Sequence, residues 1–172
     1  KEIVPKTVDE YLEFIQKAKD QDELQLLMNP AWHVHNGNCP DEEMIMSFSM
    51  LLNLVETSNA DTKELLWKFV KKYKKGIKEE NHPIFDNLIS YAIKYFNDVI
   101  KLQKKYKKPN SEEKKVLEAL LKNLDKCNDQ MSPEEIQTLI YSTGKENGYS
   151  ENLRDWFKLI YEVVFGDENG PR

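Results

Sequence analysis

Apolar residues recur at spacings of three and four along almost the whole chain, which is the pattern of amphipathic helices. We expect helices over residues 8–28, 42–58, 62–75, 82–106, 111–128, 133–147 and 150–165. No segment alternates apolar and polar residues for long enough to predict a strand. The predicted fold class is therefore all-α, with about seven helices joined by short connections.

Capping residues predict where these helices begin and end. The sharpest predicted start is at Ser132, because Pro133 follows it and Glu135 stands where it completes a capping box. An irregular stretch is expected over residues 31–40. The other residues expected to begin or end helices are Thr7 with Glu10, Pro30, Asp41, Asp61, Gly76, Asn81, Pro109, Gly148, Ser150 and Gly166.

The net charge of −5 conceals a strong segregation of charge along the chain. Residues 63–108 carry 13 basic and 5 acidic side chains, whereas residues 1–62 carry 4 basic and 12 acidic ones. A positive face of this kind attracts phosphate backbones, although lysines also complement helix dipoles or simply face solvent. The lysines that we expect to hold phosphates are Lys71, Lys72, Lys104 and Lys105.

Composition excludes several classes of protein. With 172 residues, of which 40% are hydrophobic and 32% charged, the sequence is typical of a folded globular chain. Its apolar runs are far shorter than the roughly 18 residues of a membrane-spanning helix. Cys39 and Cys127 form no disulfide framework, so we expect a cytoplasmic protein without membrane association. Because the chain begins at Lys1 rather than Met, we expect a piece of a longer protein.

No motif of catalytic chemistry is found in the sequence. It has neither a glycine-rich phosphate loop nor a Gly-x-Ser-x-Gly nucleophile elbow. His33, His35 and Cys39 are metal-ligand types, but their spacing matches no common zinc pattern and no fourth ligand is evident. We expect the two imidazoles to form hydrogen bonds at a turn built by Asn36 and Gly37. Catalytic, metal and cofactor-binding residues are therefore not expected in this chain.

Most aromatic residues fall on the apolar faces of the predicted helices and are expected in the core. Arg154 and Trp156 stand out, because unpaired bases are bound by aromatic rings and by guanidinium planes. The other arginine of the sequence, Arg172, belongs to a C-terminal Gly-Pro-Arg. Arg154, Trp156 and Arg172 are therefore the residues that we expect to read bases.

Several motifs of the sequence are shared with one known family. They are Trp32-His33-Val34-His35-Asn36-Gly37, the segments 47–54 and 87–93, the run Arg154-Asp155-Trp156-Phe157-Lys158, and the tail from Gly166 to Arg172. The Arg-Asp-Trp-Phe run and the Gly-Pro-Arg tail are the most specific of them. On these residues the sequence resembles the C-terminal part of class I lysyl-tRNA synthetases, over essentially its whole length.

The resemblance implies a particular fold and domain organisation. In that family this region is an α-helix cage that holds the tRNA anticodon, and a Rossmann catalytic domain that uses ATP with magnesium lies upstream. The sequence has neither the His-Ile-Gly-His nor the Lys-Met-Ser-Lys-Ser signature of that domain. The implied domains are a connecting segment over residues 1–40 and a cage over 41–172, divided into 41–108 and 109–172.

The implied function is recognition of the lysine tRNA anticodon within an enzyme that ligates lysine to its tRNA. The implied partners are lysine tRNA and the protein's own N-terminal catalytic domain, without DNA. The alternative is a helical protein-interaction module that binds no RNA, because acidic ends and a basic centre also suit a partner of complementary charge.

Overall fold

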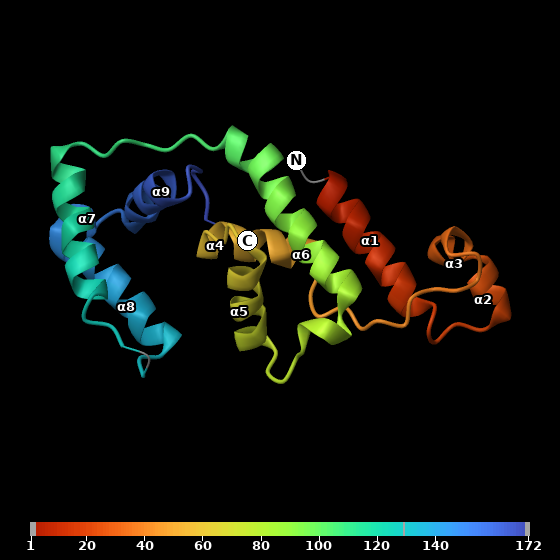
Figure 1. Ribbon diagram of the computed structural model, residues 1–172. Helices are drawn as coiled ribbons and strands as arrows, with labels where there is room; N and C mark the ends of the chain where they lie inside the picture. The colour runs from red at the N-terminus through yellow and green to blue at the C-terminus, as the bar shows by residue number, and fades with distance from the viewer. Residues whose placement is uncertain (1–2, 129, 171–172) are drawn as a thin grey trace. The chain divides into compact units, whose positions relative to one another are not determined.

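The computed structural model describes residues 3–128 and 130–170, and all regular secondary structure within them is helical (Figure 1). The nine α-helices of the described part are α1 (Ile3–Lys17), α2 (Glu23–Leu27), α3 (Pro30–Val34), α4 (Phe48–Ser58), α5 (Lys63–Tyr73), α6 (Pro83–Tyr95), α7 (Ser111–Leu124), α8 (Pro133–Gly144) and α9 (Leu153–Val164). The predicted all-α class is confirmed. None of the helices in these ranges is long and apolar enough to cross a membrane.

The chain divides by its internal contacts into two compact units, Lys1–Gln103 and Lys104–Arg172. Each unit has its own hydrophobic core. In the first unit, Leu12 of α1 belongs to the same buried cluster as Leu51 of α4 and Ile89 of α6. In the second unit, the buried members of the hydrophobic cluster are Leu120, Trp156 and Leu159. The predicted functional division into residues 1–40, 41–108 and 109–172 stays a prediction.

The helix expected over residues 8–28 is interrupted. The first helix, α1, begins at Ile3 and carries Pro5 in its first turn, so Thr7 lies inside the helix and does not cap it. A turn separates α1 from α2, whose N-cap Asp22 forms a capping box with Gln25. Pro30 begins α3 instead of ending a helix, because Asn29 caps this helix and a proline is well tolerated at the first helical position. Part of the stretch expected to be irregular is therefore helical.

The helix expected over residues 42–58 begins later, at Phe48, and its N-cap is Ser47 rather than Asp41. The irregular segment before it contains Glu42, which forms hydrogen bonds with another helix. The Glu42 carboxylate accepts hydrogen bonds from the backbone N–H groups of Ile84 (2.8 Å) and Phe85 (2.7 Å). These are N–H groups of the first turn of α6, which have no partner within their own helix. Glu42 therefore caps α6 from a distant part of the chain.

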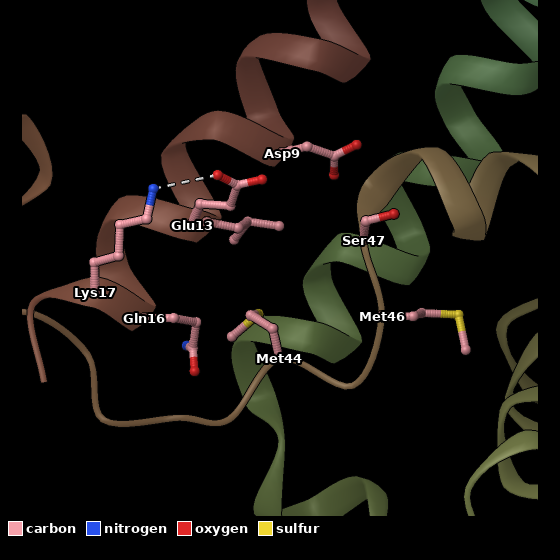
Figure 2. A pocket seen from close by; sticks show the side chains of 8 residues that line it. Asp9, Glu13, Gln16, Lys17, Met44, Met46 and Ser47 are labelled. Carbon is pink, nitrogen blue, oxygen red and sulfur yellow. Dashed lines mark hydrogen bonds and ion pairs between the residues drawn. The ribbon is translucent and has the colours of Figure 1, made fainter. Parts of the chain in front are cut away.

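A second remote cap begins α4. The carboxylate of Asp9 on α1 accepts hydrogen bonds from the N–H of Phe48 (2.5 Å) and from the N–H (3.2 Å) and hydroxyl (2.5 Å) of Ser49. Figure 2 shows Asp9 on α1 and Ser47 at the start of α4. A negative charge at this position also complements the positive end of the α4 dipole. Asp9 therefore joins α1 to α4 through charge-assisted hydrogen bonds.

Three further helix ends differ from expectation. The N-cap of α5 is Thr62 rather than Asp61, and the residue before α6 is His82 rather than Asn81. The α-helical part of α6 ends at Tyr95, and the chain continues as a π-helical turn (Phe96–Ile100) and a 3-10 turn (Lys101–Gln103). The expected helix over residues 82–106 is therefore a shorter α-helix with an irregular extension.

The predicted start of α8 is confirmed, because the Ser132 side chain accepts from the N–H of Glu135 and the Glu135 carboxylate accepts from the N–H of Ser132. The α-helix ends at Gly144, and a π-helical turn (Lys145–Tyr149) follows. Gly148 in this turn has a φ of 95°, in the left-handed region that favours glycine.

Asp86 on α6 links that helix to α5 inside the first unit. Its carboxylate accepts hydrogen bonds from the indole N–H of Trp67 (2.9 Å) and from the ammonium group of Lys63. Burial opposes ionisation of Asp86, but these hydrogen bonds and the Lys63 charge outweigh burial and hold its pKa below the usual value. A carboxyl group with a lowered pKa in the folded state stabilises the fold above its unfolded pKa of about 4. It loses this effect as the pH falls through the folded pKa.

We therefore expect Asp86→Asn to lower the free energy of unfolding by about 1 kcal/mol at pH 7, because the ion pair is partly exposed to solvent. The difference from the unsubstituted chain should shrink as the pH falls from the unfolded pKa of about 4 towards the folded pKa of Asp86. Urea unfolding at pH 7 and at pH 3 measures it, with Asp98→Asn, an exposed aspartate of the same unit, as the control. An equal loss at both pH values would contradict the prediction.

Candidate nucleic-acid interface

The candidate base-reading residue Arg154 is exposed in the first turn of α9. It lines a hollow of about 580 Å³ that lies within the second unit, between one face of α9 and the segment after it. Phe157, Lys158 and Tyr161 follow Arg154 at i+3, i+4 and i+7, so the four side chains lie on the same helix face. Asn169 lines the hollow from the opposite segment.

The other polar groups of the hollow are largely engaged with one another. The Lys158 ammonium lies 3.7 Å from the Glu162 carboxylate and 3.3 Å from that of Glu168. The side-chain amide of Asn152 donates to the Asp155 carboxylate at 2.6 Å. Within residues 3–128 and 130–170, no hydrogen bond or ion pair engages the Arg154 guanidinium. Its five N–H donors are therefore available to a ligand in the hollow.

Half-buried aromatic rings accompany Arg154 on this face of α9. The ring centroids of Phe157 and Tyr161 lie 6.1 Å apart, and Tyr141 of α8 meets Phe157 edge-on at 4.8 Å. Flat apolar rings of this kind are the surfaces on which unpaired bases stack. The helical spacing predicts that most aromatic residues of this helix lie in the core. Phe157 and Tyr161 stand three and seven positions after Arg154, and this spacing is the sequence feature that places them on the same helix face as Arg154.

Trp156 has a different role from the one predicted. Its side chain is fully buried in the core of the second unit, and its indole N–H donates to the carbonyl of Ile140 at 3.0 Å. A Cβ added to Gly144 would lie 2.5 Å from Cδ1 of the indole ring, so the ring lies directly against the α8 backbone. The ring therefore presents no face to a base, and stacking is left to Phe157 and Tyr161.

The predicted phosphate-binding lysines of the first unit lie at the end of α5. Lys71 forms an ion pair with Glu79 at 2.6 Å, and its ammonium lies 6.0 Å from the centroid of the Trp67 ring. Lys72 is exposed. Lys72 is therefore the more accessible of the two to a phosphate group.

The predicted lysines of the second unit differ from each other in the same way. The Lys104 side chain is only 4% exposed and its ammonium lies 3.9 Å from the Asp167 carboxylate, so it is part of the protein's packing. Lys105 is exposed, while its backbone N–H donates to the carbonyl of Gly166 at 2.9 Å. The predicted phosphate contact is compatible with the position of Lys105 but not with that of Lys104. Arg172 lies outside the described residues, so its role stays a prediction.

The two histidines near the predicted turn form hydrogen bonds, but their partners lie outside the turn. The His33 ring bonds to the Leu27 carbonyl at 2.7 Å, and the His35 ring bonds to the Tyr11 hydroxyl at 2.5 Å. The turn itself has the expected left-handed residues, since φ is 50° at Asn36 and 84° at Gly37. In the part of the chain that the structure describes, no group of three or more His, Cys, Asp or Glu side chains is placed to hold a metal ion.

Another hollow, of about 360 Å³, lies in the first unit between α1 and the segment before α4 (Figure 2). Its polar groups already have partners inside the protein. Asp9 caps α4, Lys17 lies 3.5 Å from the Glu13 carboxylate, and the Ser47 hydroxyl accepts from the N–H of Met50. Fewer polar groups of this hollow are therefore available to bind a ligand than in the Arg154 hollow.

Comparison with known proteins finds relatives across almost the whole chain. The chain is 40% identical over 173 residues to the lysine–tRNA ligases of Rickettsia peacockii (strain Rustic) and Rickettsia africae (strain ESF-5), and 39% identical to that of Rickettsia felis. These alignments cover 99% of this chain and 33% of each relative, so the chain spans about a third of their length. No protein-family model matches the chain, and no solved structure matches it significantly. The predicted resemblance to lysyl-tRNA synthetases is confirmed.

Proposed function

We propose that this chain is the anticodon-binding region of a class I lysine–tRNA ligase. It is similar to a region that makes up about one third of the length of such ligases. The 40% identity over 99% of the chain supports the assignment. The complete protein would ligate lysine to its tRNA in the cytoplasm, with ATP and magnesium bound by a catalytic domain outside this chain. The role of this chain is then to bind lysine tRNA.

The observation that carries the site assignment is the Arg154 guanidinium, which no described residue engages, beside the Phe157 and Tyr161 rings. A lysine anticodon is rich in uridine, and uracil presents two carbonyl acceptors and one ring N–H donor. The guanidinium can donate a charge-assisted hydrogen bond to one of the carbonyls, and the rings can stack on the base. The Asn169 side-chain amide offers both an acceptor and donors. Together these groups match the polar edge and the face of uracil.

Discrimination between bases follows from unsatisfied hydrogen bonds. A base of the wrong type leaves buried polar groups without partners, which costs about 1–3 kcal/mol for each group. Exposed lysines such as Lys72 and Lys105 add affinity through phosphates, but they do not read the sequence. On this mechanism, specificity resides in the Arg154 hollow, whereas the lysines determine the salt dependence.

The test is binding of lysine tRNA and of the same tRNA with an exchanged anticodon, measured across a series of salt concentrations. We expect Arg154→Ala to weaken binding of lysine tRNA by about tenfold, the loss of one charge-assisted hydrogen bond, with a smaller effect on the exchanged tRNA. Helicity by circular dichroism should not change, because Arg154 is exposed and has no partner among the described residues.

The matched control is Lys122→Ala, which removes an exposed cation from α7 of the same unit. It should reduce the salt dependence slightly without altering the preference between the two tRNAs. Equal affinity of the unsubstituted chain for both tRNAs at every salt concentration would refute anticodon recognition. A flat response to salt would exclude the lysines from the interface.

A further inference from the structure

The short helix α2 exposes an apolar face. Leu24 is 76% exposed, Leu27 55% and Met28, which follows the helix directly, 84%, and no residue of α2 is buried. Their spacing of i, i+3 and i+4 places the three side chains on one side of the helix. Single exposed leucines are ordinary, but three adjacent large side chains form a contiguous patch. We name Leu24, Leu27 and Met28 the α2 patch.

The α2 patch borders a groove that α1 completes. Leu24 and Met28 line one wall of a groove of about 540 Å³, and Phe14 and Lys17 of α1 line the other. The ammonium of Lys17 lies 5.5 Å from the centroid of the Phe14 ring, which keeps its charge over the aromatic surface. The remaining lining residues are polar: Asp20, Gln21, Gln25 and Asn29. The lining of the groove therefore combines apolar and polar side chains, as protein interfaces do.

Hydrogen bonds hold this exposed segment in one geometry. Asn29 is only 1% exposed, and its amide donates to the carbonyl of Phe14 (2.8 Å) and to the side chain of Gln21 (2.7 Å). Its side-chain oxygen accepts from the N–H of Ala31 at 2.9 Å, which fixes the start of α3. The segment is therefore a preorganised surface, which lowers the entropic cost of binding a partner.

We propose that the α2 patch and its groove are the surface on which the remaining two thirds of the longer polypeptide dock. The inference rests on the proposed function, since it takes the chain to be part of a protein as long as its relatives, of which it spans 33%. Three exposed side chains are few beside the roughly 20–30 residues that each partner contributes to a specific complex of separate proteins. A segment of the same polypeptide needs less area, because the covalent link supplies a high effective concentration.

The experiment compares hydrogen exchange of the α2 amides in the 172-residue chain and in the full-length protein, both without RNA. We expect the amides of residues 22–29 to exchange about tenfold more slowly in the full-length protein, because docking restricts local opening of this short helix. The core amides around Leu51 and Ile89 should exchange alike in both. Equal exchange of the α2 amides in the two proteins would overturn the proposal.

Two alternative occupants are separated by the same measurement. Protection of α2 in the 172-residue chain that grows with protein concentration would assign the patch to a second copy of the chain. Protection that appears only on addition of tRNA would assign it to the nucleic acid. Either result would overturn docking of the remaining polypeptide.

Variants extend the test to the side chains themselves. Leu24→Lys with Met28→Lys should abolish the protection of α2 in the full-length protein, while the 172-residue chain keeps its unfolding midpoint, because both side chains are exposed. Leu102→Lys, which alters another exposed leucine (79%) of the first unit, is the matched control and should leave the protection intact. Persistent protection in the double variant would contradict the assignment to this patch.

The docking proposal and the proposed function fail in different ways. The double variant should bind lysine tRNA at least as tightly as the unsubstituted 172-residue chain, since the patch is not part of the Arg154 hollow and the added lysines carry positive charge. Normal tRNA binding together with unprotected α2 amides would reject the docking surface alone. Protected α2 amides in a protein that binds no tRNA would reject anticodon recognition alone.

Discussion

Replacement of Trp156 by alanine is expected to destabilise the second unit by about 3–5 kcal/mol, the usual cost of removing a large buried aromatic side chain. The indole is fully buried between α8 and α9, and its N–H satisfies the carbonyl of Ile140. Because Gly144 lets the ring approach the α8 backbone closely, removal of the ring would leave a cavity against that backbone. Hydrogen exchange of the α8 and α9 amides measures this loss separately from the first unit.

Trp156→Phe is the control that separates packing from hydrogen bonding. It keeps most of the buried ring but leaves the Ile140 carbonyl without its donor, so we expect a smaller loss of about 1–3 kcal/mol. Arg154→Ala should leave the stability unchanged. If Trp156→Ala instead weakened tRNA binding without any change in amide exchange, the ring would be a contact for RNA and the description of it as a core residue would be wrong.

Replacement of Asp9 by alanine is expected to cost about 2–3 kcal/mol of stability in the first unit, because it removes a charged acceptor of three hydrogen bonds. The N–H groups of Phe48 and Ser49 would lose their partner at the start of α4, because the N-cap Ser47 bonds to the N–H of Met50 instead. Faster exchange of the α4 amides and a lower urea midpoint measure the effect.

Two variants test whether the lost stability comes from the hydrogen bonds of Asp9 or from its negative charge alone. Asp9→Asn keeps one acceptor oxygen but removes the charge, so an intermediate effect is expected. Glu10→Ala removes the neighbouring, exposed carboxylate of α1 and should change stability by less than about 0.5 kcal/mol. Equal effects of the Asp9→Ala and Glu10→Ala variants would show that the net charge of α1, rather than the remote cap, stabilises α4.

The candidate site could be predicted from the sequence only in part. Arg154 is exposed, as its predicted role in RNA binding requires, and that role stays a prediction. The predicted Trp156 is buried, whereas Phe157 and Tyr161 border the hollow. Successive residues of a helix point about 100° apart, so a shift of one position exchanges the buried and exposed faces. The lysines show the same limit, because charge does not distinguish Lys104, which is 4% exposed, from its exposed neighbour Lys105.

By itself, the sequence determined the all-α class, the start of α8 and the relationship to lysyl-tRNA synthetases. Hydrophobic periodicity, a capping box and short motifs are local properties that can be read from neighbouring residues. Only the tertiary structure decided where α4 and α6 begin, because their N–H groups are capped by Asp9 and Glu42, 39 to 43 positions away along the chain. It also decided which rings of α9 line the hollow, since that depends on which face packs against α8. Contacts between distant residues exist only in the folded chain, and no local pattern specifies them.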